Sequence, residues 1–508
     1  MSDASMSPTA APAGHIAARG VDTVGKLETR GTDYIPLSER HGKASELFWV
    51  WMGGQFCLGI IVLGSLPVIF GLGWWSSVTA LTVGIAIGSL LYMPLALFGP
   101  RTGTNDPVAS GAHFGIRGRV LGAAISIFVA LGFYALVIWT GGQAVMVAGN
   151  HLFDSSTGDG ALVISMAIVA VVTVVIAVYG HATLIMTYRA FAVVVGLLLV
   201  ALVFVQLPDF NASYHGGSYI LGSFWSTWVL SVAVGASLPI SYATFGGDYS
   251  RYFPRTVSDR SIIFWNGLGM FLSCWLALVI GAYLTTMFAN QGDLFVVGIA
   301  ASIPHWFLVP FLILAILGTW PQGGLCLYGC GLSTTTVSWR VAGRAATTIV
   351  LSAIGVAVVY IATVVYNGID SLTAFVTIMN VTISPWMAVM LVGFVLRRGR
   401  YAPLDLQPYT GLGARSIYWF TAGINGRAFV AWIPAAVIGF LFSNTSLYTG
   451  PFANSLNGID LSYATAFGIA ALIYFALVKL FPERNVIPEL DEVEREDEML
   501  AAAGIAQA

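Results

Sequence analysis

Long apolar runs separated by short polar segments dominate the pattern of this chain. A helix that crosses a bilayer needs about 20 mostly apolar residues, and the chain contains twelve such runs, bounded by Gly, Pro and charged residues. They lie near 47–70, 76–98, 121–149, 161–179, 188–206, 224–246, 261–288, 304–335, 346–366, 371–396, 427–443 and 461–481. The pattern predicts an all-α polytopic membrane protein with twelve transmembrane helices.

Lys and Arg are confined to alternate connections between these runs. The connections 71–75, 150–160, 207–223, 289–303, 367–370 and 444–460 contain neither residue type, so all 22 lie on the other side or in the two tails. Lys and Arg near the ends of spans stay in the cytoplasm. We therefore expect a multi-pass protein of the plasma membrane with both termini cytoplasmic.

Composition supports a membrane protein and excludes several other classes. Charged residues make up 9% of the chain and hydrophobic residues 57%, whereas a soluble domain carries about 25% charged residues. The lipid bilayer is then the main solvent. A net charge of −2 provides no basic field for nucleic acid, and we expect no obligate protein partner.

Reactive side chains are scarce inside the predicted spans. No Asp, Glu, Lys or Arg lies in the middle of a span, and the four cysteines all lie in apolar runs. A catalytic centre built on paired carboxylates or on His has no residues to use. We therefore expect no enzyme activity, cofactor, disulfide or metal site, and we expect backbone, amide and hydroxyl groups to bind any substrate.

Three predicted spans carry residues that interrupt helices. They are the first at 51–55 (WMGGQ), the sixth at 234–239 (VGASLP) and the eighth at 318–324 (GTWPQGG). Unwound backbone at membrane depth is tolerated where it lines a cavity. Spans one and six are five apart, and a repeat of five helices must be inverted in its second copy, which is typical of transporters with a central site.

Four stretches resemble the nucleobase–cation symporter family that includes purine-cytosine permeases. Residues 247–254 read GDYSRYFP, similar to the family's SDYSRYFP, and residues 132–144 read GFYALVIWTGGQA, similar to GWFGIQTWIGGQA. Residues 327–332 (LYGCGL) and 397–401 (RRGRY) match in the expected order. The resemblance implies a leucine-transporter-like fold of two inverted five-helix repeats plus two extra helices.

This fold divides the chain into seven parts. They are a loose cytoplasmic tail (1–46), the first repeat (47–206), an extracellular loop (207–223), the second repeat (224–396), a cytoplasmic loop (397–426), two further helices (427–482) and an acidic cytoplasmic tail (483–508).

The resemblance also implies a site in which a flat heterocycle lies between aromatic rings and amides read its edge. Phe133 matches the third-helix aromatic, usually Trp, that stacks on the ligand, and Gln322 resembles the Asn of a Pro-Asn pair. Val137 stands where many relatives carry Gln or Asn, and the sixth-helix aromatic is absent unless Tyr242 serves after a shift in register. The other expected substrate-binding residues are Pro321, Ser237, Leu238, Ser241, Gln55 and Gly59.

Coupling to a cation is also implied by the resemblance. The matching positions in the first and eighth helices are Gly54, Cys57, Gly318 and Thr319. Sodium requires several oxygen ligands, and these residues offer a single hydroxyl, so H⁺ and Na⁺ both remain open. The carboxylates available for proton coupling are Glu46 and Asp248, both predicted to be peripheral.

Together these features predict a secondary-active symporter that imports a purine or cytosine base by alternating access. A transporter for another planar ring, such as allantoin, a hydantoin or a vitamin, is the alternative within transport. An uncoupled facilitator is the alternative of a different class.

Overall fold

The computed structural model describes residues 32, 34–178, 181–288, 295–337, 344–407, 413–445, 447–483 and 486–488, and every regular element in these ranges is helical. Eight helices are long and apolar enough to cross a membrane, one bent pair of helices does so jointly, and three shorter apolar helices accompany them. Each of the twelve predicted spans contains one of these, so the prediction of an all-helical, multi-pass membrane protein is confirmed.

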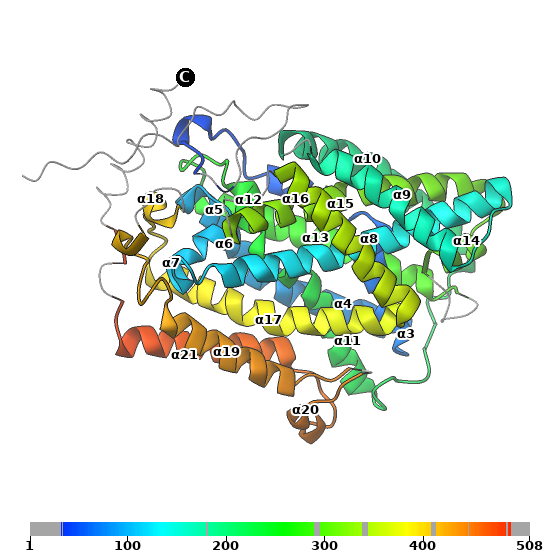
Figure 1. Cartoon of the computed structure of the whole chain (residues 1–508). Coiled ribbons are helices and arrows are strands. Elements are labelled where there is room, and N and C mark those ends of the chain that lie inside the picture. The colour runs from blue at the N-terminus through cyan, green and yellow to red at the C-terminus, as the bar shows by residue number, and fades with distance from the viewer. Residues whose placement is uncertain are drawn as a thin grey trace, which may run out of the picture.

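The spans follow the chain in a simple order (Figure 1). They are α1 (Glu46–Gln55) with α2 (Leu58–Ile61), η2 (Val62–Ser65) and α3 (Leu66–Ile69); α4 (Trp74–Tyr92) with η3 (Met93–Leu97) and α5 (Phe98–Thr102); α8 (Val120–Phe153); α9 (Asp159–Val178); α10 (His181–Gln206); α11 (Phe224–Ser241); α13 (Asp259–Thr285); α15 (Leu308–Val337); α16 (Arg344–Tyr360) with the π-helix η7 (Ile361–Val365); α17 (Gly368–Leu396); α19 (Gly426–Leu441); and α21 (Ser462–Leu480).

Short helices join several of these spans. They are η1 (Leu37–Glu39), α6 (Asp106–Ala109), α7 (Gly111–Phe114), η4 (Leu207–Asp209), η5 (Tyr242–Thr244), α12 (Gly246–Ser250), α14 (Phe295–Ser302), η6 (His305–Phe307), α18 (Pro403–Leu406), η8 (Gly413–Arg415) and α20 (Pro451–Ser455). Among them, η5, α6 and α12 contribute to the argument below.

The first span is broken where the glycines predicted it. Helix α1 ends at Gln55, Cys57 is extended, and the chain turns by 77° before α2 continues. Glycine is a poor helix former, and Gly54 has a further role because a Cβ atom there would lie 3.3 Å from the Gln322 side chain of α15. The absence of a side chain at Gly54 therefore allows α1 to lie close to α15.

The sixth and eighth spans differ from the expectation. Helix α11 continues through Pro239 to Ser241, and α15 continues through Pro321 to Val337. The predicted unwinding at 235–239 and at 318–324 is therefore wrong. A buried helix tolerates proline where neighbouring helices support it, and the sixth span changes instead to a 3-10 helix at Tyr242.

Small residues bring α4 and α11 into backbone contact. A Cβ atom at Gly88 would lie 2.7 Å from the carbonyl oxygen of Ala236, and one at Gly235 would lie 2.8 Å from that of Leu81. Helices in membranes associate through such close contacts because lipid provides no hydrophobic drive between them. The contact fixes the position of the end of α11, and hence of η5, relative to α4.

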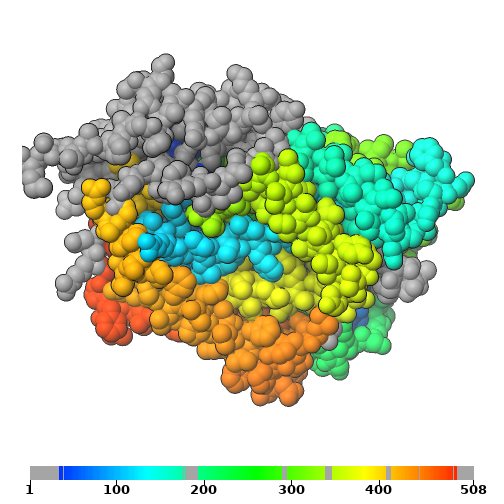
Figure 2. Space-filling model, in the orientation of Figure 1, coloured from blue at the N-terminus to red at the C-terminus, as the bar shows by residue number. Residues whose placement is uncertain are grey.

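Helices α17, α19 and α21 pack together along one side of the bundle (Figure 1). Their shared interface is built from fully buried alanines, Ala388, Ala435 and Ala470. The outward faces carry large exposed apolar side chains, such as Val437 on α19 and Leu197 on α10. The face shown in Figure 2 includes α10, α16 and α19, and exposed apolar side chains of this kind are those expected to contact lipid.

The described parts of the two predicted tails are packed rather than loose. Ile35 is fully buried, its N–H donates to the carbonyl oxygen of Gly103, and Arg40 donates to that of Pro100. Glu483 forms a buried ion pair with Arg397 at 2.6 Å, so this first residue of the expected acidic tail is structural. Residues 1–31, 33, 484, 485 and 489–508 of these tails lie outside the described residues.

Candidate functional site

A buried aromatic pair lies between α8 and η5. Phe133 of α8 and Tyr242 of η5 have ring centroids 6.2 Å apart and planes inclined by 24°, which is a stacked arrangement. Both rings are almost fully buried. Phe133 lies on the third span, and Tyr242 faces it because the irregular part of the sixth span begins at this residue.

An amide joins this pair from a third helix. The Nε2 of Gln322 on α15 donates to the hydroxyl oxygen of Tyr242 at 2.9 Å, and its Oε1 has no hydrogen-bond partner within the described residues. A buried amide oxygen without a donor is costly. The Oε1 of Gln322 is therefore a free acceptor, whereas its Nε2 already donates to Tyr242.

A second aromatic layer supports Tyr242 from the side of α1. The ring of Trp51 meets Tyr242 edge-on with centroids 5.2 Å apart, and it makes similar contacts with Tyr92 and Tyr249. The Trp51 indole N–H donates to Asn266 of α13 at 2.8 Å. This indole is therefore fixed in orientation, and it fixes Tyr242. Sequence reasoning missed Trp51, although it directly precedes the glycines of the break.

The remaining predicted substrate residues fall into two groups. The hydroxyls of Ser237 and Ser241 donate to backbone carbonyls of their own helix, at 2.7 Å and 2.5 Å. Gly59 lies against the α8 backbone, because a Cβ atom there would be 3.0 Å from Val137. These three residues make structural contacts in this conformation.

Gln55 is the other polar side chain at the break. It is fully buried, and neither its amide oxygen nor its amide nitrogen has a partner among the described residues. Leu238 and Pro321 are buried apolar residues of α11 and α15. Gln55 therefore carries unused donor and acceptor capacity of the kind a heterocycle requires.

The predicted cation-binding residues gather only partly. A Cβ atom at Gly318 would lie 2.9 Å from the Phe56 carbonyl oxygen and 3.2 Å from Cys57 Cα, so α15 meets the break at this point. The Thr319 hydroxyl donates to the Ile316 carbonyl, and its methyl group faces Gly141 of α8. Among the described residues, no group of three or more His, Cys, Asp or Glu side chains could hold a metal ion.

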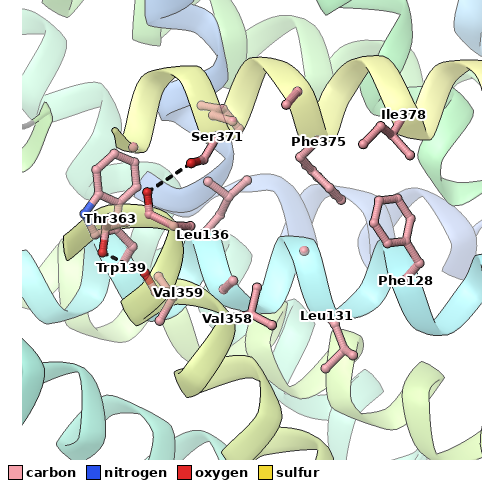
Figure 3. Close-up of a pocket in the computed structure, with 16 residues that line it drawn as sticks. Phe128, Leu131, Leu136, Trp139, Val358, Val359, Thr363, Ser371, Phe375 and Ile378 are labelled. Atoms are coloured by element: carbon pink, nitrogen blue, oxygen red, sulfur yellow. Dashed lines mark hydrogen bonds between the residues drawn. The ribbon is translucent and has the colours of Figure 1, made fainter. Parts of the chain in front are cut away.

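A cavity of about 350 Å³ lies beside the aromatic pair, between α8, α16, η7 and α17 (Figure 3). Its lining is almost entirely apolar, and Phe128 and Ile378 at its edge are more than a third exposed. Phe375 separates the cavity from the pair, since its ring meets Phe133 edge-on at 5.5 Å. The cavity does not include Tyr242 or Gln322, and its exposed edge marks it as a feature of the apolar outer face.

Two acids lie buried beyond the ends of the spans. Asp248, predicted at the end of the sixth span, lies in α12 and is 1% exposed, and Asp106 of α6, which sequence reasoning missed, is equally buried. The Asp106 Oδ2 accepts a hydrogen bond from the Gly247 N–H at 2.7 Å. The Asn-Asp-Pro sequence at 105–107 signals the start of a helix, but no signal in the sequence indicates that this helix start is buried.

Comparisons with known proteins agree with this architecture. The family model described as permease for cytosine/purines, uracil, thiamine, allantoin matches residues 34–465. The putative purine-cytosine permease YxlA of Bacillus subtilis is 27% identical over 470 residues, which cover 89% of this chain and 96% of that protein. A vitamin B6 transporter of Saccharomyces cerevisiae is 24% identical over 53% of this chain and 46% of its own length.

Solved structures share the fold. Mhp1, a nucleobase-cation-symport-1 family transporter in a closed conformation with bromovinylhydantoin bound, superposes with a TM-score of 0.72 at 18% identity, covering 93% of this chain and all of that one. A Na⁺-coupled sialic acid symporter gives a TM-score of 0.57 at 12% identity, covering 90% of this chain and 93% of that one. The expected transporter fold is thereby confirmed.

Proposed function

Because the chain belongs to the family of permeases for cytosine, purines, uracil, thiamine and allantoin, we propose that it imports a purine or cytosine base together with a cation, by alternating access. The observation that carries the substrate proposal is the juxtaposition of Phe133, Tyr242 and Gln322. Two aromatic faces can stack on a flat ring, and one amide can donate to and accept from the edge of a nitrogen heterocycle. In this proposal the protein is a transporter and not an enzyme.

Ligand binding requires the aromatic pair to open. For a third ring to fit between two others, the two outer rings must be about 7–8 Å apart, which is twice the usual carbon–carbon contact distance. The ring centroids of Phe133 and Tyr242 are only 6.2 Å apart. Moving Tyr242 outward also breaks its hydrogen bond with Gln322. The released N–H then donates to the edge of the base, and Oε1 accepts from it. Binding thus exchanges one internal hydrogen bond for two with the ligand.

Gln55 supplies a second set of polar atoms in this proposal. It is the last residue of α1, one residue after Gly54, whose Cβ position lies 3.3 Å from the Gln322 Oε1. The two amides together could satisfy the alternating donors and acceptors of a purine or cytosine edge. Val137, which is apolar and fully buried, contributes no such group, so the polar recognition comes from α1 and α15.

We place the protein in the plasma membrane with both termini in the cytoplasm. The support is the distribution of Lys and Arg, none of which lies in the six alternate connections. The four cysteines are all buried, so a single cysteine introduced at Ser156 or at Arg400 can be labelled selectively. A reagent that does not cross the membrane should label the first from outside intact cells and the second only after lysis.

Transport of labelled bases into proteoliposomes tests the function directly. The proposal requires accumulation above the outside concentration when a proton or sodium gradient is imposed. Uptake that stops at equal concentrations would instead identify an uncoupled facilitator. Competition by unlabelled adenine, hypoxanthine, guanine, cytosine, allantoin, hydantoins and pyridoxine distinguishes a nucleobase carrier from one for another planar ring.

A further inference from the structure

One buried amide joins three of the spans behind the second aromatic layer. Asn266 of α13 is fully buried, and its Oδ1 accepts the indole N–H of Trp51 at 2.8 Å. Its Nδ2 donates to the carbonyl oxygen of Met93, the first residue of η3, at 3.1 Å. Both polar atoms of this amide are therefore bonded, one to the first span and one to the second. Asn266 thus links α13 to α1 and to η3.

The chain around Asn266 leaves room for both partners. Residues 266–269 read NGLG. A Cβ atom at Gly267 would lie 3.2 Å from the Cβ of Met93. One at Gly269 would lie 2.8 Å from a Cα atom of α1 and 3.2 Å from the Cδ1 of Trp51, which is next to the indole N–H. The two glycines therefore let α13 approach η3 and α1 closely enough for both hydrogen bonds.

The bond to Asn266 selects one orientation of the Trp51 indole. The second side-chain torsion of tryptophan is broad and about two-fold, so a flipped ring is the natural alternative. A buried indole N–H needs a partner, and a flip would take this N–H away from Asn266. In the observed orientation Trp51 meets the rings of Tyr242, Tyr92 and Tyr249 edge-on, with centroids 5.2, 5.7 and 5.5 Å apart. A flipped indole would change all three contacts.

Tyr242 is supported from two sides. Gln322 of α15 donates to its hydroxyl at 2.9 Å, and Trp51 of α1 packs against its ring. The stacked arrangement with Phe133 depends on the tilt of this ring, which is 24° between the two planes. One support of that tilt is thus an indole whose own orientation is set by Asn266. A residue of α13 therefore reaches the aromatic pair through Trp51.

We propose that Asn266 is a positioning residue of the base site: it holds the Trp51 indole in the orientation that supports Tyr242, and so raises the affinity of the stack for a base. When the pair opens, Tyr242 stacks on the base only if its ring keeps a defined orientation, and a free indole would let the ring turn. Loss of the Asn266 amide therefore weakens base binding by about three- to tenfold. In its effect on the base, the inference rests on the proposed function.

The positioning itself is measured on the purified full chain without substrate. Ultraviolet resonance Raman spectra report the hydrogen bonding of indole and phenol groups, and subtracting the spectra of Trp51→Phe and Tyr242→Phe from that of the wild type isolates the two bands. In Asn266→Leu the Trp51 band should shift to that of a weakly bonded N–H, and the Tyr242 band should change with it. Thr82→Val is the matched control, because the Thr82 hydroxyl accepts the N–H of Trp275 at 2.9 Å, also between α13 and the second span. It should leave both bands in place.

A double-mutant cycle on the Kd for the base tests the route through Trp51. Asn266→Leu should weaken binding about three- to tenfold in the wild type and have no further effect in Trp51→Phe, because both changes remove the same link. Thr82→Val should leave the Kd unchanged in both backgrounds. If Asn266→Leu does not fold, Trp51→Phe is compared with Trp275→Phe, and only the first should weaken binding.

Two results would overturn the proposal. Trp51 and Tyr242 bands that are unchanged in Asn266→Leu would show that Asn266 does not position either ring, whatever the substrate is. Equal weakening of base binding by Asn266→Leu in the wild type and in Trp51→Phe would show that its effect does not pass through the indole. Shifted bands in a protein that binds none of the bases would instead overturn the proposed function and leave the positioning of Tyr242 confirmed.

Discussion

The hydrogen bond from the Gln322 Nε2 to the Tyr242 hydroxyl, 2.9 Å long, joins α15 to the irregular part of the sixth span. It holds Tyr242 in the stack with Phe133. In the proposed function the same bond occupies the donor that the base would use, so this internal bond and ligand binding compete for one N–H group.

Removing the Gln322 amide should strongly weaken uptake while the protein remains in the membrane. Gln322→Ala leaves two polar groups of the bound base without partners, at about 1–3 kcal/mol each, and this loss is partly offset because binding no longer breaks the bond to Tyr242. Affinity should therefore fall about ten- to a hundredfold. Uptake kinetics with quantified surface protein measure this. Gln206→Ala is a matched control, because that buried amide bonds to Ser302 away from the aromatic pair. Unchanged affinity in Gln322→Ala would remove Gln322 from the site.

Removing only the Tyr242 hydroxyl should have the opposite effect on binding. Tyr242→Phe retains the ring but frees the Gln322 donor, so the unliganded protein loses about 0.5–1.5 kcal/mol of stability. Ligand affinity should rise by up to about tenfold, because binding no longer breaks an internal bond. Parallel measurements of Tm and ligand Kd test both parts. A Kd that weakens in Tyr242→Phe would show that the hydroxyl itself contacts the ligand.

Enlarging the stacking ring should be tolerated. Phe133→Trp increases the aromatic face on α8. It should leave the affinity for a purine unchanged or strengthen the binding free energy by up to about 1 kcal/mol. Phe133→Leu, which has comparable apolar character without the ring, should weaken binding. Loss of uptake in a correctly folded Phe133→Trp protein would mean that the pocket is built for a smaller ligand.

The ion pair between Arg397 and Glu483 should be important for stability and not for substrate recognition. Both side chains are buried, and Asn425 also donates to Glu483 at 2.7 Å. Glu483→Gln leaves the guanidinium charge buried without its partner, which costs about 3–5 kcal/mol. Thermal unfolding should show a large fall in Tm, with the Kd of the folded fraction unchanged.

Asp259→Asn provides the matched comparison, because its ion pair with Arg101 is exposed. That change should alter stability by no more than about 1 kcal/mol. Equal effects of Glu483→Gln and Asp259→Asn would contradict the structural role given to Glu483.

Hydropathy was sufficient to locate the twelve apolar helical segments, of which eight single helices and one bent pair are long enough to cross a membrane, because burial in lipid is a property of whole segments. The break after Gln55 was also predictable, since Gly53 and Gly54 weaken the helix where it ends. Pro239 and Pro321 led to the wrong prediction of unwound backbone. Packing against neighbouring helices keeps α11 and α15 helical around them. A proline in the sequence does not reveal how well its neighbours support it.

The aromatic pair was predicted in part. Phe133 followed from a motif, but the identification of Tyr242 depended on where the helix changes at Ser241, which the sequence does not reveal. Asp106 could not have been found, because nothing in a polar loop of the sequence indicates that Gly247 brings the backbone of α12 against it. Patterns along the chain predict segments, whereas contacts between loops depend on tertiary packing.

Ligand-dependent thermal stabilisation of the purified protein tests the central claim most directly. Nucleobases, hydantoins and ring vitamins are each added with sodium, with potassium and at two pH values, since a ligand that binds the folded state raises Tm by mass action. The account predicts a shift with adenine, hypoxanthine, guanine or cytosine that is lost in Gln322→Ala. A shift confined to rings other than nucleobases, or one that persists unchanged in Gln322→Ala, would contradict it.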